Sequence, residues 1–277
     1  MSDLSITIVV NSCLDKPYLL GEFGLSLYIE YGNKKFLFDT GAGETLLVNA
    51  ANLNLNLPEL DGVILSHGHR EHTGGLSCLL PFKLKKIYAH PNIFEEKFAR
   101  DADDFLRNVS CPVSTNTLKN NQVELCFNTD SYEIIPGLIL SGEIPLTQGS
   151  EDYIPPAVFY NWTSTGLHEE TLPDEQMLLI NTKKGWVIVS GCGHRGIKAM
   201  LDKAKGLTGC KKFHMIIGGL HLLDANGELI KEYAKLLDQH FEKVIPLHCA
   251  GCKAIFAFAS TLGEKFQLAF TGNVIEV

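Results

Sequence analysis

Alternating apolar and polar positions near the start of the chain predict β-strands. Residues 25–30 alternate, residues 31–35 turn the chain, and residues 35–39 form a second apolar run. Together these segments indicate a β-hairpin. Residues 62–65 form a short, continuously apolar run, which is typical of a buried strand. Residues 6–10 predict another strand.

Apolar residues at helical spacing occur between the strands. The clearest apolar face lies within residues 229–237, and residues 195–205 and 254–262 have helical character as well. Apolar positions between residues 93 and 106 suggest a further helix with a less regular period. Because strands and helices interleave, we expect layers of α/β type.

Two strand-like segments resemble each other. Residues 36–41 and residues 186–191 are apolar runs that end in a small polar residue and a glycine. This similarity indicates two related halves with one site between them. A chain of 277 residues is long for one domain but within the observed range. We therefore predict that residues 1–277 form a single domain.

Composition and charge exclude several classes of protein. Apolar residues make up 45% of the chain and charged residues 20%, as in soluble globular proteins. The net charge of −8 argues against a nucleic-acid partner, which would need a basic face. No apolar run is long enough for a membrane span, and the N-terminus lacks a basic segment before its apolar run. We therefore expect a cytoplasmic protein that contacts no membrane, with its eight cysteines as free thiols or metal ligands.

The segment that carries most chemical information follows the strand predicted at residues 62–65. His67, His69, Glu71 and His72 lie within six consecutive positions. A loop at a strand end directs several side chains into one volume, and imidazole and carboxylate groups bind zinc, iron or manganese. A surface loop that contains histidines by chance is the alternative, and the density of ligands disfavours it. The segment predicts a site for one or two divalent ions, with zinc favoured, in which Glu71 and His72 serve a second metal.

The same segment resembles the His-x-His-x-Asp-His signature of the metallo-β-lactamase superfamily. Asp39 resembles the early aspartate of that superfamily, which orients the metal site from behind the ligands. Four further segments resemble the branch named after dihydropterin–ribofuranosylaminobenzene phosphate synthase: residues 21–26, 190–197, 217–222 and 246–251. The resemblance covers nearly the whole chain. It implies a four-layer αββα sandwich.

The resemblance also implies ligands from the second half of the chain. His194 follows the strand predicted at residues 186–190, and His248 follows a strand-like run at residues 243–247. By resemblance and placement, both are predicted metal ligands. Cys192 stands where other branches have a bridging aspartate, and its position suits either a thiolate ligand or a packed cysteine. His221 follows two glycines, and we expect it to bind substrate or phosphate rather than metal.

The remaining cysteines favour structural roles. Cys249 and Cys252 form a Cys-x-x-Cys pair, which in other proteins has redox activity. We favour the start of a helix instead, with Cys249 beside the site and Cys252 packed. The others are scattered and are interpreted as packing residues: Cys13, Cys78, Cys111, Cys126 and Cys210.

Several positions depart from the branch pattern. Glu71 replaces the aspartate of the signature, which lengthens the side chain by one C–C bond. Phe23, Ala250 and Leu146 stand where the branch usually has histidine, threonine and arginine. These changes remove polar groups from the expected pocket, and they weaken the case for the synthase activity more than the case for the metal site.

These observations predict a metal-dependent hydrolase with a small phosphorylated or ester-type substrate. Metal binding would lower the pKa of bound water and supply hydroxide as the nucleophile. Glu71 would bind the second metal or orient the water, and His221 would bind or protonate the leaving group. The alternatives are a pterin-linked synthase and a non-catalytic metal or ligand sensor on the same fold. The sequence does not determine the oligomeric state.

Overall fold

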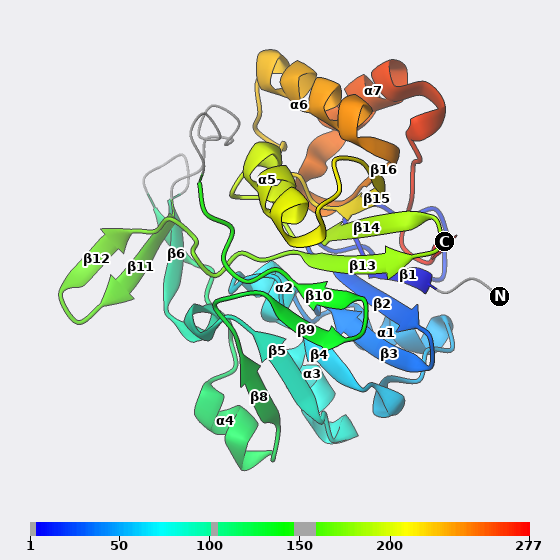
Figure 1. Ribbon diagram of the computed structural model, residues 1–277. Helices are drawn as coiled ribbons and strands as arrows, with labels where there is room; N and C mark the ends of the chain where they lie inside the picture. Colours follow the sequence, from blue (N-terminus) through cyan, green and yellow to red (C-terminus); the bar gives the residue numbers. More distant parts are fainter. Residues whose placement is uncertain (1–3, 101–104, 147–158) are drawn as a thin grey trace.

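A computed structural model describes residues 4–100, 105–146 and 159–277 of the protein. Two large β-sheets lie face to face, and helices cover the outer face of each sheet (Figure 1). This is the predicted four-layer αββα arrangement, so the fold prediction is confirmed.

The first large sheet has seven strands in the order β17-β1-β2-β3-β4-β5-β8. β1, β2, β3 and β17 pair in antiparallel fashion, whereas β3, β4, β5 and β8 are parallel. The predicted hairpin and the buried strand that follows it are confirmed as β2, β3 and β4. The strands are β1 (Leu4–Val10), β2 (Ser26–Tyr31), β3 (Lys34–Phe38), β4 (Gly62–Ile64), β5 (Lys86–Ala89), β8 (Glu124–Phe127) and β17 (Val274–Glu276).

The second large sheet has six strands in the order β16-β15-β14-β13-β10-β9. Its β14, β15 and β16 are parallel, so the loops that follow them leave from one edge of the sheet. The strands are β9 (Tyr132–Ile135), β10 (Leu138–Leu140), β13 (Leu178–Thr182), β14 (Gly185–Ser190), β15 (Phe213–Gly218) and β16 (Phe241–Pro246).

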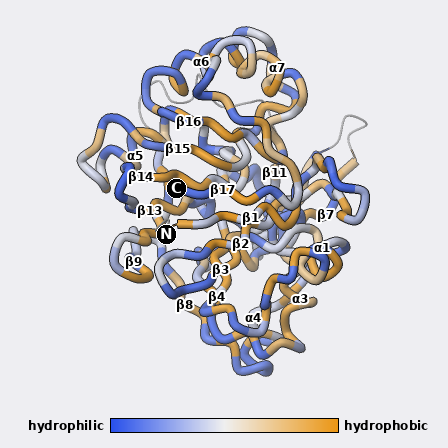
Figure 2. Tube along the Cα trace, turned by 90° about the vertical axis from the view of Figure 1, so that its right-hand side faces the viewer, coloured by the Kyte–Doolittle hydropathy of each residue, from blue (hydrophilic) through white to orange (hydrophobic). Residues whose placement is uncertain are grey.

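Both faces of each large sheet are buried. On β14, Val187 and Val189 face the first sheet, whereas Ile188 packs under the helices. A strand that is buried on both faces has a continuously apolar sequence. This explains the apolar run at residues 186–190. Figure 2 shows this apolar character along β14, β15 and β16.

The outer layers contain helices of two sizes. α5, α6 and α7 cover the second sheet, and shorter helices cover the first (Figure 1). The three helices predicted in the second half of the chain are confirmed as α5, α6 and α7. The helices are α1 (Leu46–Asn52), α2 (Arg70–Thr73), α3 (Leu76–Leu79), α4 (Thr115–Asn120), α5 (Ile197–Thr208), α6 (Gly227–His240) and α7 (Gly251–Leu262). Among the residues that the structure describes, no helix combines the length and the apolar composition needed to cross a bilayer.

The helix predicted within residues 93–106 is wrong. The chain there forms a short 3-10 helix, Pro91–Phe94, and then enters a small antiparallel sheet with the order β12-β11-β6-β7. Residues 101–104 of the segment lie outside the described residues. The small sheet projects from one side of the molecule (Figure 1). Its strands are β6 (Lys97–Arg100), β7 (Leu106–Asn108), β11 (Phe159–Thr163) and β12 (Gly166–Glu169).

Candidate metal centre

The loop after β4 and the short helix α2 bury three imidazoles. His67, His69 and His72 have no exposed surface. The ring centroid of His67 lies 4.6 Å from that of His69 and 4.3 Å from that of His72. The three side chains predicted from this motif therefore occupy one small volume.

Two histidines from the second half of the chain reach the same volume. His194 follows β14, His248 follows β16, and both side chains are buried. Nε2 of His194 lies 3.2 Å from Nε2 of His67. The ring centroid of His248 lies 4.9 Å from that of His72. Parallel strands place their following loops at one edge, and this brings the five predicted histidine ligands together.

Asp39 orients two of these imidazoles, His72 directly and His67 through Ser66. Its carboxylate accepts hydrogen bonds from the backbone N–H of Ser66 at 2.8 Å and from the Ser66 hydroxyl at 2.7 Å. Nδ1 of His72 lies 2.7 Å from the same carboxylate, and Nδ1 of His67 lies 2.9 Å from the Ser66 hydroxyl oxygen. A proton on each Nδ1 leaves Nε2 of both rings with a free lone pair, as metal-binding histidines require.

The donor atoms of this cluster fit a divalent metal. Among the described residues, several buried imidazole nitrogens have no hydrogen-bond partner: Nδ1 and Nε2 of His69 and of His248, Nε2 of His72 and Nδ1 of His194. A buried polar atom without a partner costs free energy. Converging neutral imidazoles meet the requirements of zinc, iron or manganese ions, so the residues present suit such an ion.

Burial also keeps most of these imidazoles neutral. Burial lowers the pKa of His67, His69 and His194 well below its usual value, and positive charge on neighbouring groups lowers it further. Burial lowers the pKa of His248 to about 3. Burial acts in the same direction on His72, but the Asp39 carboxylate raises the pKa of this ring overall. Neutral rings have the lone pairs that a metal needs.

Cys192, whose role the sequence did not decide, lies centrally among the candidate ligands. The side chain is buried, and its sulfur belongs to three groups of metal-ligating atoms that lie within 4.8 Å of one another. These groups are His67 with Cys192 and His194, His72 with Cys192 and His248, and Cys192 with His221 and Cys249. The signal in the sequence was its place at the bridging position of the superfamily.

Glu71 lies beside the cluster. Its Oε1 is 3.8 Å from Nδ1 of His69, and its side chain retains 18% exposure. Among the described residues, the groups of converging ligand atoms do not include Glu71. The role of Glu71 as a metal ligand or as the catalytic base therefore stays a prediction.

Two adjacent acidic residues that were not predicted from the sequence bind the loops that carry the candidate ligands. Oε1 of Glu175 accepts the backbone N–H groups of Gly193 and His194, both at 2.7 Å, and Oε2 accepts that of Arg195 at 2.6 Å. Oδ2 of Asp174 accepts the N–H of Gly68 at 2.8 Å. Burial raises the pKa of Glu175, and these three donors oppose the rise. One dipeptide thus binds a loop from each half of the chain.

A buried lysine lies behind the first loop. Lys97 on β6 forms an ion pair with Glu170, and its Nζ lies 3.3 Å from Oδ1 of Asp174. Burial raises the pKa of Glu170 to about 7, against the attraction of Lys97. Nothing in the local spacing pointed to these residues, because the lysine lies in the segment that was predicted to be helical.

His221 and two phenylalanines border the cluster. The ring centroid of His221 lies 4.1 Å from that of His194, so the predicted catalytic histidine is adjacent to the predicted ligands. Phe159 lies 4.5 Å from His69 between ring centroids. Phe23, which is 53% exposed, lies 4.6 Å from His248. The site therefore has an aromatic border.

The structure changes part of the interpretation of the cysteines. Cys249 is buried beside the site, as expected, but Cys252 is exposed, so the prediction that it is packed is wrong. The five scattered cysteines are partly buried, and all eight are free thiols. The close neighbour of Cys249 is Cys192, with the two sulfurs 3.0 Å apart.

Three residues of the site have a strained backbone conformation. Asp39, His221 and His248 all have positive φ angles, of 58°, 50° and 49°. Such conformations are unfavourable for residues with a Cβ and often occur at functional sites.

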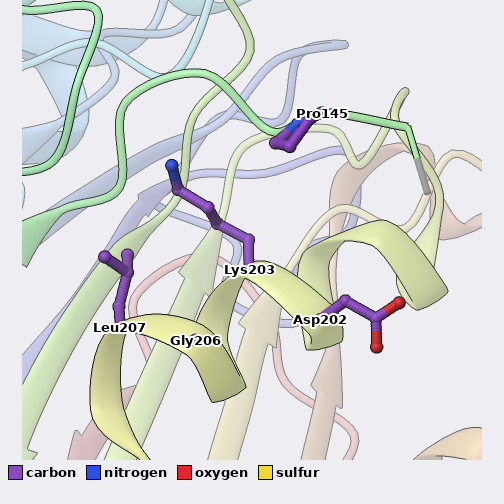
Figure 3. A pocket seen from close by; sticks show the side chains of 5 residues that line it. All are labelled: Pro145, Asp202, Lys203, Gly206 and Leu207. Atoms are coloured by element: carbon purple, nitrogen blue, oxygen red, sulfur yellow. The ribbon is translucent and has the colours of Figure 1, made fainter.

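A cavity of about 290 Å³ lies between α5 and Pro145, away from this cluster. None of the predicted site residues lines it (Figure 3).

Comparison with known proteins agrees with this geometry. A model of the metallo-β-lactamase superfamily matches residues 19–154. A solved structure described as a metal-dependent hydrolase of the β-lactamase superfamily is 26% identical, with a TM-score of 0.84 and 99% of both chains covered. The chain belongs to the metallo-β-lactamase superfamily.

Within the superfamily, the resemblance to one branch is confirmed. The chain is 34% identical to 7,8-dihydropterin-6-methyl-4-(beta-D-ribofuranosyl)-aminobenzene-5'-phosphate synthase of Methanocaldococcus jannaschii over 268 residues, which are 92% of this chain and 90% of the relative. It is 26% identical to an uncharacterized protein of the same organism, over 98% of this chain and 100% of that protein.

Proposed function

We propose that the protein is a metal-dependent hydrolase that acts on a small phosphorylated or ester-type substrate. The observation that carries this proposal is the convergence of five buried imidazoles, several of whose nitrogens have no other partner in the described part of the chain. His67, His69, His72, His194 and His248 would hold one or two divalent ions, with zinc as the proposed metal.

The metal would act as a Lewis acid and lower the pKa of water so that a nucleophile forms near neutral pH. Other residues of the chain keep the candidate ligands in place. Asp39 fixes the ring of His72, and Glu175 fixes the loop that carries His194. Preorganised groups of this kind avoid rearrangement during the reaction.

Two residues are proposed to act on the substrate. Glu71 retains exposure beside His69, so its carboxylate is placed to orient the attacking water or to bind a second ion. His221 lies beside His194 and is partly buried, which suits binding or protonation of the leaving group.

The test is hydrolysis of a panel of phosphomonoesters, phosphodiesters and carboxylic esters by protein that has been stripped of metal and then reloaded with zinc, iron or manganese. We expect activity to be lost on chelation and restored by at least one ion. The variant His67→Ala/His69→Ala should stay inactive after reloading, whereas His168→Ala, at an exposed histidine, should behave as the wild type. Metal binding without turnover of any substrate would contradict the proposal and favour a sensor.

A pterin-linked synthase is the second candidate. It is supported by the 34% identical relative that is named as such a synthase, and by the aromatic border of Phe23 and Phe159, which suits a planar ring. A dihydropterin pyrophosphate would be supplied with and without an aminobenzene riboside. Coupled product that forms only with both substrates would identify the synthase. Release of pyrophosphate without the riboside would favour the hydrolase.

A further inference from the structure

Two buried sulfurs meet at the edge of the imidazole cluster. Cys192 follows β14 and Cys249 follows β16, and 57 residues separate them along the chain. Their Sγ atoms lie 3.0 Å apart, and the two residues are 2% and 3% exposed. The proposed hydrolase function uses the imidazoles and leaves this pair unexplained.

A third donor faces the same point. Nδ1 of His221 lies 3.5 Å from Sγ of Cys192. The backbone N–H of His221 donates to Sγ of Cys249 at 3.3 Å. The two sulfurs and the imidazole nitrogen of His221 all lie within 4.8 Å of one another. Thiolates and imidazoles at such separations are typical of sites for zinc and other thiophilic ions.

The backbone around the sulfurs is shaped to let them approach. A Cβ on Gly219 would meet Sγ of Cys249 at 2.7 Å and Cα of Cys192 at 3.0 Å. A Cβ on Gly218 would meet the carbonyl oxygen of Ser190 at 1.9 Å. The two glycines thus allow the loops after β14, β15 and β16 to come together. His221 then adopts a φ of 50°, which costs free energy and brings its ring to Cys192.

We propose that Cys192, His221 and Cys249 form a sulfur-rich site for a thiophilic divalent ion, which adjoins the imidazole centre and has Cys192 in common with the candidate ligand groups of that centre. In a tetrahedral site with Zn–S bonds of about 2.3 Å, two sulfurs stand about 3.8 Å apart, so the pair needs to open by less than 1 Å. On binding, each thiol loses its proton to solvent and bonds the ion as a thiolate. Thiolate donors select zinc or cadmium over magnesium or manganese. This proposal does not depend on the proposed hydrolase activity.

The experiment uses the full chain, stripped of metal and titrated with cadmium. Cadmium bound to thiolates gives an ultraviolet charge-transfer band that imidazole binding does not give. The variant His67→Ala/His72→Ala removes one histidine from each of the two imidazole groups that include Cys192 and should keep the band. The variant Cys249→Ser should lose most of it, and cadmium affinity at this site should fall by about 100-fold or more, since even the loss of an outer-shell partner costs about 10–100-fold.

The matched control is Cys252→Ser, which removes an exposed thiol three residues further on and should leave the band unchanged. Loss of the band in His67→Ala/His72→Ala, with circular dichroism showing a folded protein, would overturn the proposal, because the thiols would then act only as part of the imidazole centre. An unchanged band in Cys249→Ser would also overturn it. If either variant does not fold, X-ray absorption of the wild type loaded with zinc decides. Two sulfur neighbours of the zinc would support the proposal, and zinc without a sulfur neighbour would contradict it.

Discussion

His67 and His194 stand 127 positions apart in the sequence, yet their Nε2 atoms lie 3.2 Å from each other. Two nitrogens that bind one zinc ion at about 2.0–2.1 Å in a tetrahedral site stand about 3.3 Å apart. The pair is therefore already at the separation that a shared ion requires. Little reorganisation is needed for binding, which favours high affinity.

Metal loading should stabilise the fold. An ion that binds only the folded protein adds about 4 kcal/mol to the free energy of unfolding when its free concentration exceeds the dissociation constant by about 1,000-fold. Zinc should therefore raise the thermal unfolding temperature of the metal-free protein. The variant His67→Ala/His194→Ala should lose the part of this response that comes from the imidazole centre, and His168→Ala should keep the full response. An equal rise in all three proteins would contradict metal binding at this centre.

Asp39→Asn should weaken metal binding without unfolding the protein. Asparagine tolerates the positive φ at this position but removes the negative charge that faces His72. We expect zinc affinity to fall by about 10–100-fold, as for other groups behind metal ligands. Competition with a chromogenic chelator measures this change. Asp130→Asn, at an exposed position, is the control, and equal affinities for the two variants would disprove the role of Asp39.

Glu175→Gln should loosen the loop of His194. The carboxylate accepts three backbone N–H groups, whereas an amide has one acceptor oxygen and directs N–H groups at the remaining donors. The loss of one hydrogen bond to a charged group lowers the free energy of unfolding by about 1.5–3 kcal/mol. Urea unfolding of this variant, beside the exposed control Glu264→Gln, tests the prediction. A difference of less than about 0.5 kcal/mol between the two would rule it out.

Lys97→Met should destabilise the protein strongly. The substitution leaves Glu170 and Asp174 buried without their cation, and removal of one partner of a buried ion pair costs about 3–5 kcal/mol. Urea unfolding beside Lys231→Met, an exposed site on α6, measures the effect. The double variant Lys97→Met/Glu170→Gln should recover part of the loss, and no recovery would argue against a charge effect.

Glu170 should make stability depend on pH. Its pKa is about 7 in the folded protein, above the usual value of about 4.5, so the folded state holds a proton that the unfolded state has lost between these pH values. The contribution of Glu170 to the free energy of unfolding is complete below about pH 4.5 and falls by roughly 3 kcal/mol as the pH rises to 7.

The stability of Glu170→Gln relative to the wild type should therefore rise across this range, because glutamine imitates the protonated acid. Chemical unfolding at several pH values measures the difference between the two proteins. Glu169→Gln, at the exposed neighbouring position, should show no such trend. A constant difference between Glu170→Gln and the wild type would refute the prediction.

Local patterns determined much of the architecture. The helices α5, α6 and α7 are visible in the sequence because their apolar periodicity follows from one buried face. The hairpin of β2 and β3 is visible because two apolar segments flank a turn. The histidine cluster at residues 67–72 is visible because three ligands from one loop lie within a few positions. A metal site can be inferred from these ligands without knowledge of distant segments.

Only the tertiary structure determined the features that require distant segments of the chain to come together. The helix prediction for residues 93–106 failed because Lys97–Arg100 forms a strand between β7 and β11, and β11 lies about 60 positions away. Lys97 finds its acidic partners, Glu175 reaches the His194 loop, and Cys192 meets Cys249 only when the loops converge. A hydrogen bond or a metal site depends on distances of a few ångströms, and spacing along the chain does not give such distances between segments that are far apart in the sequence.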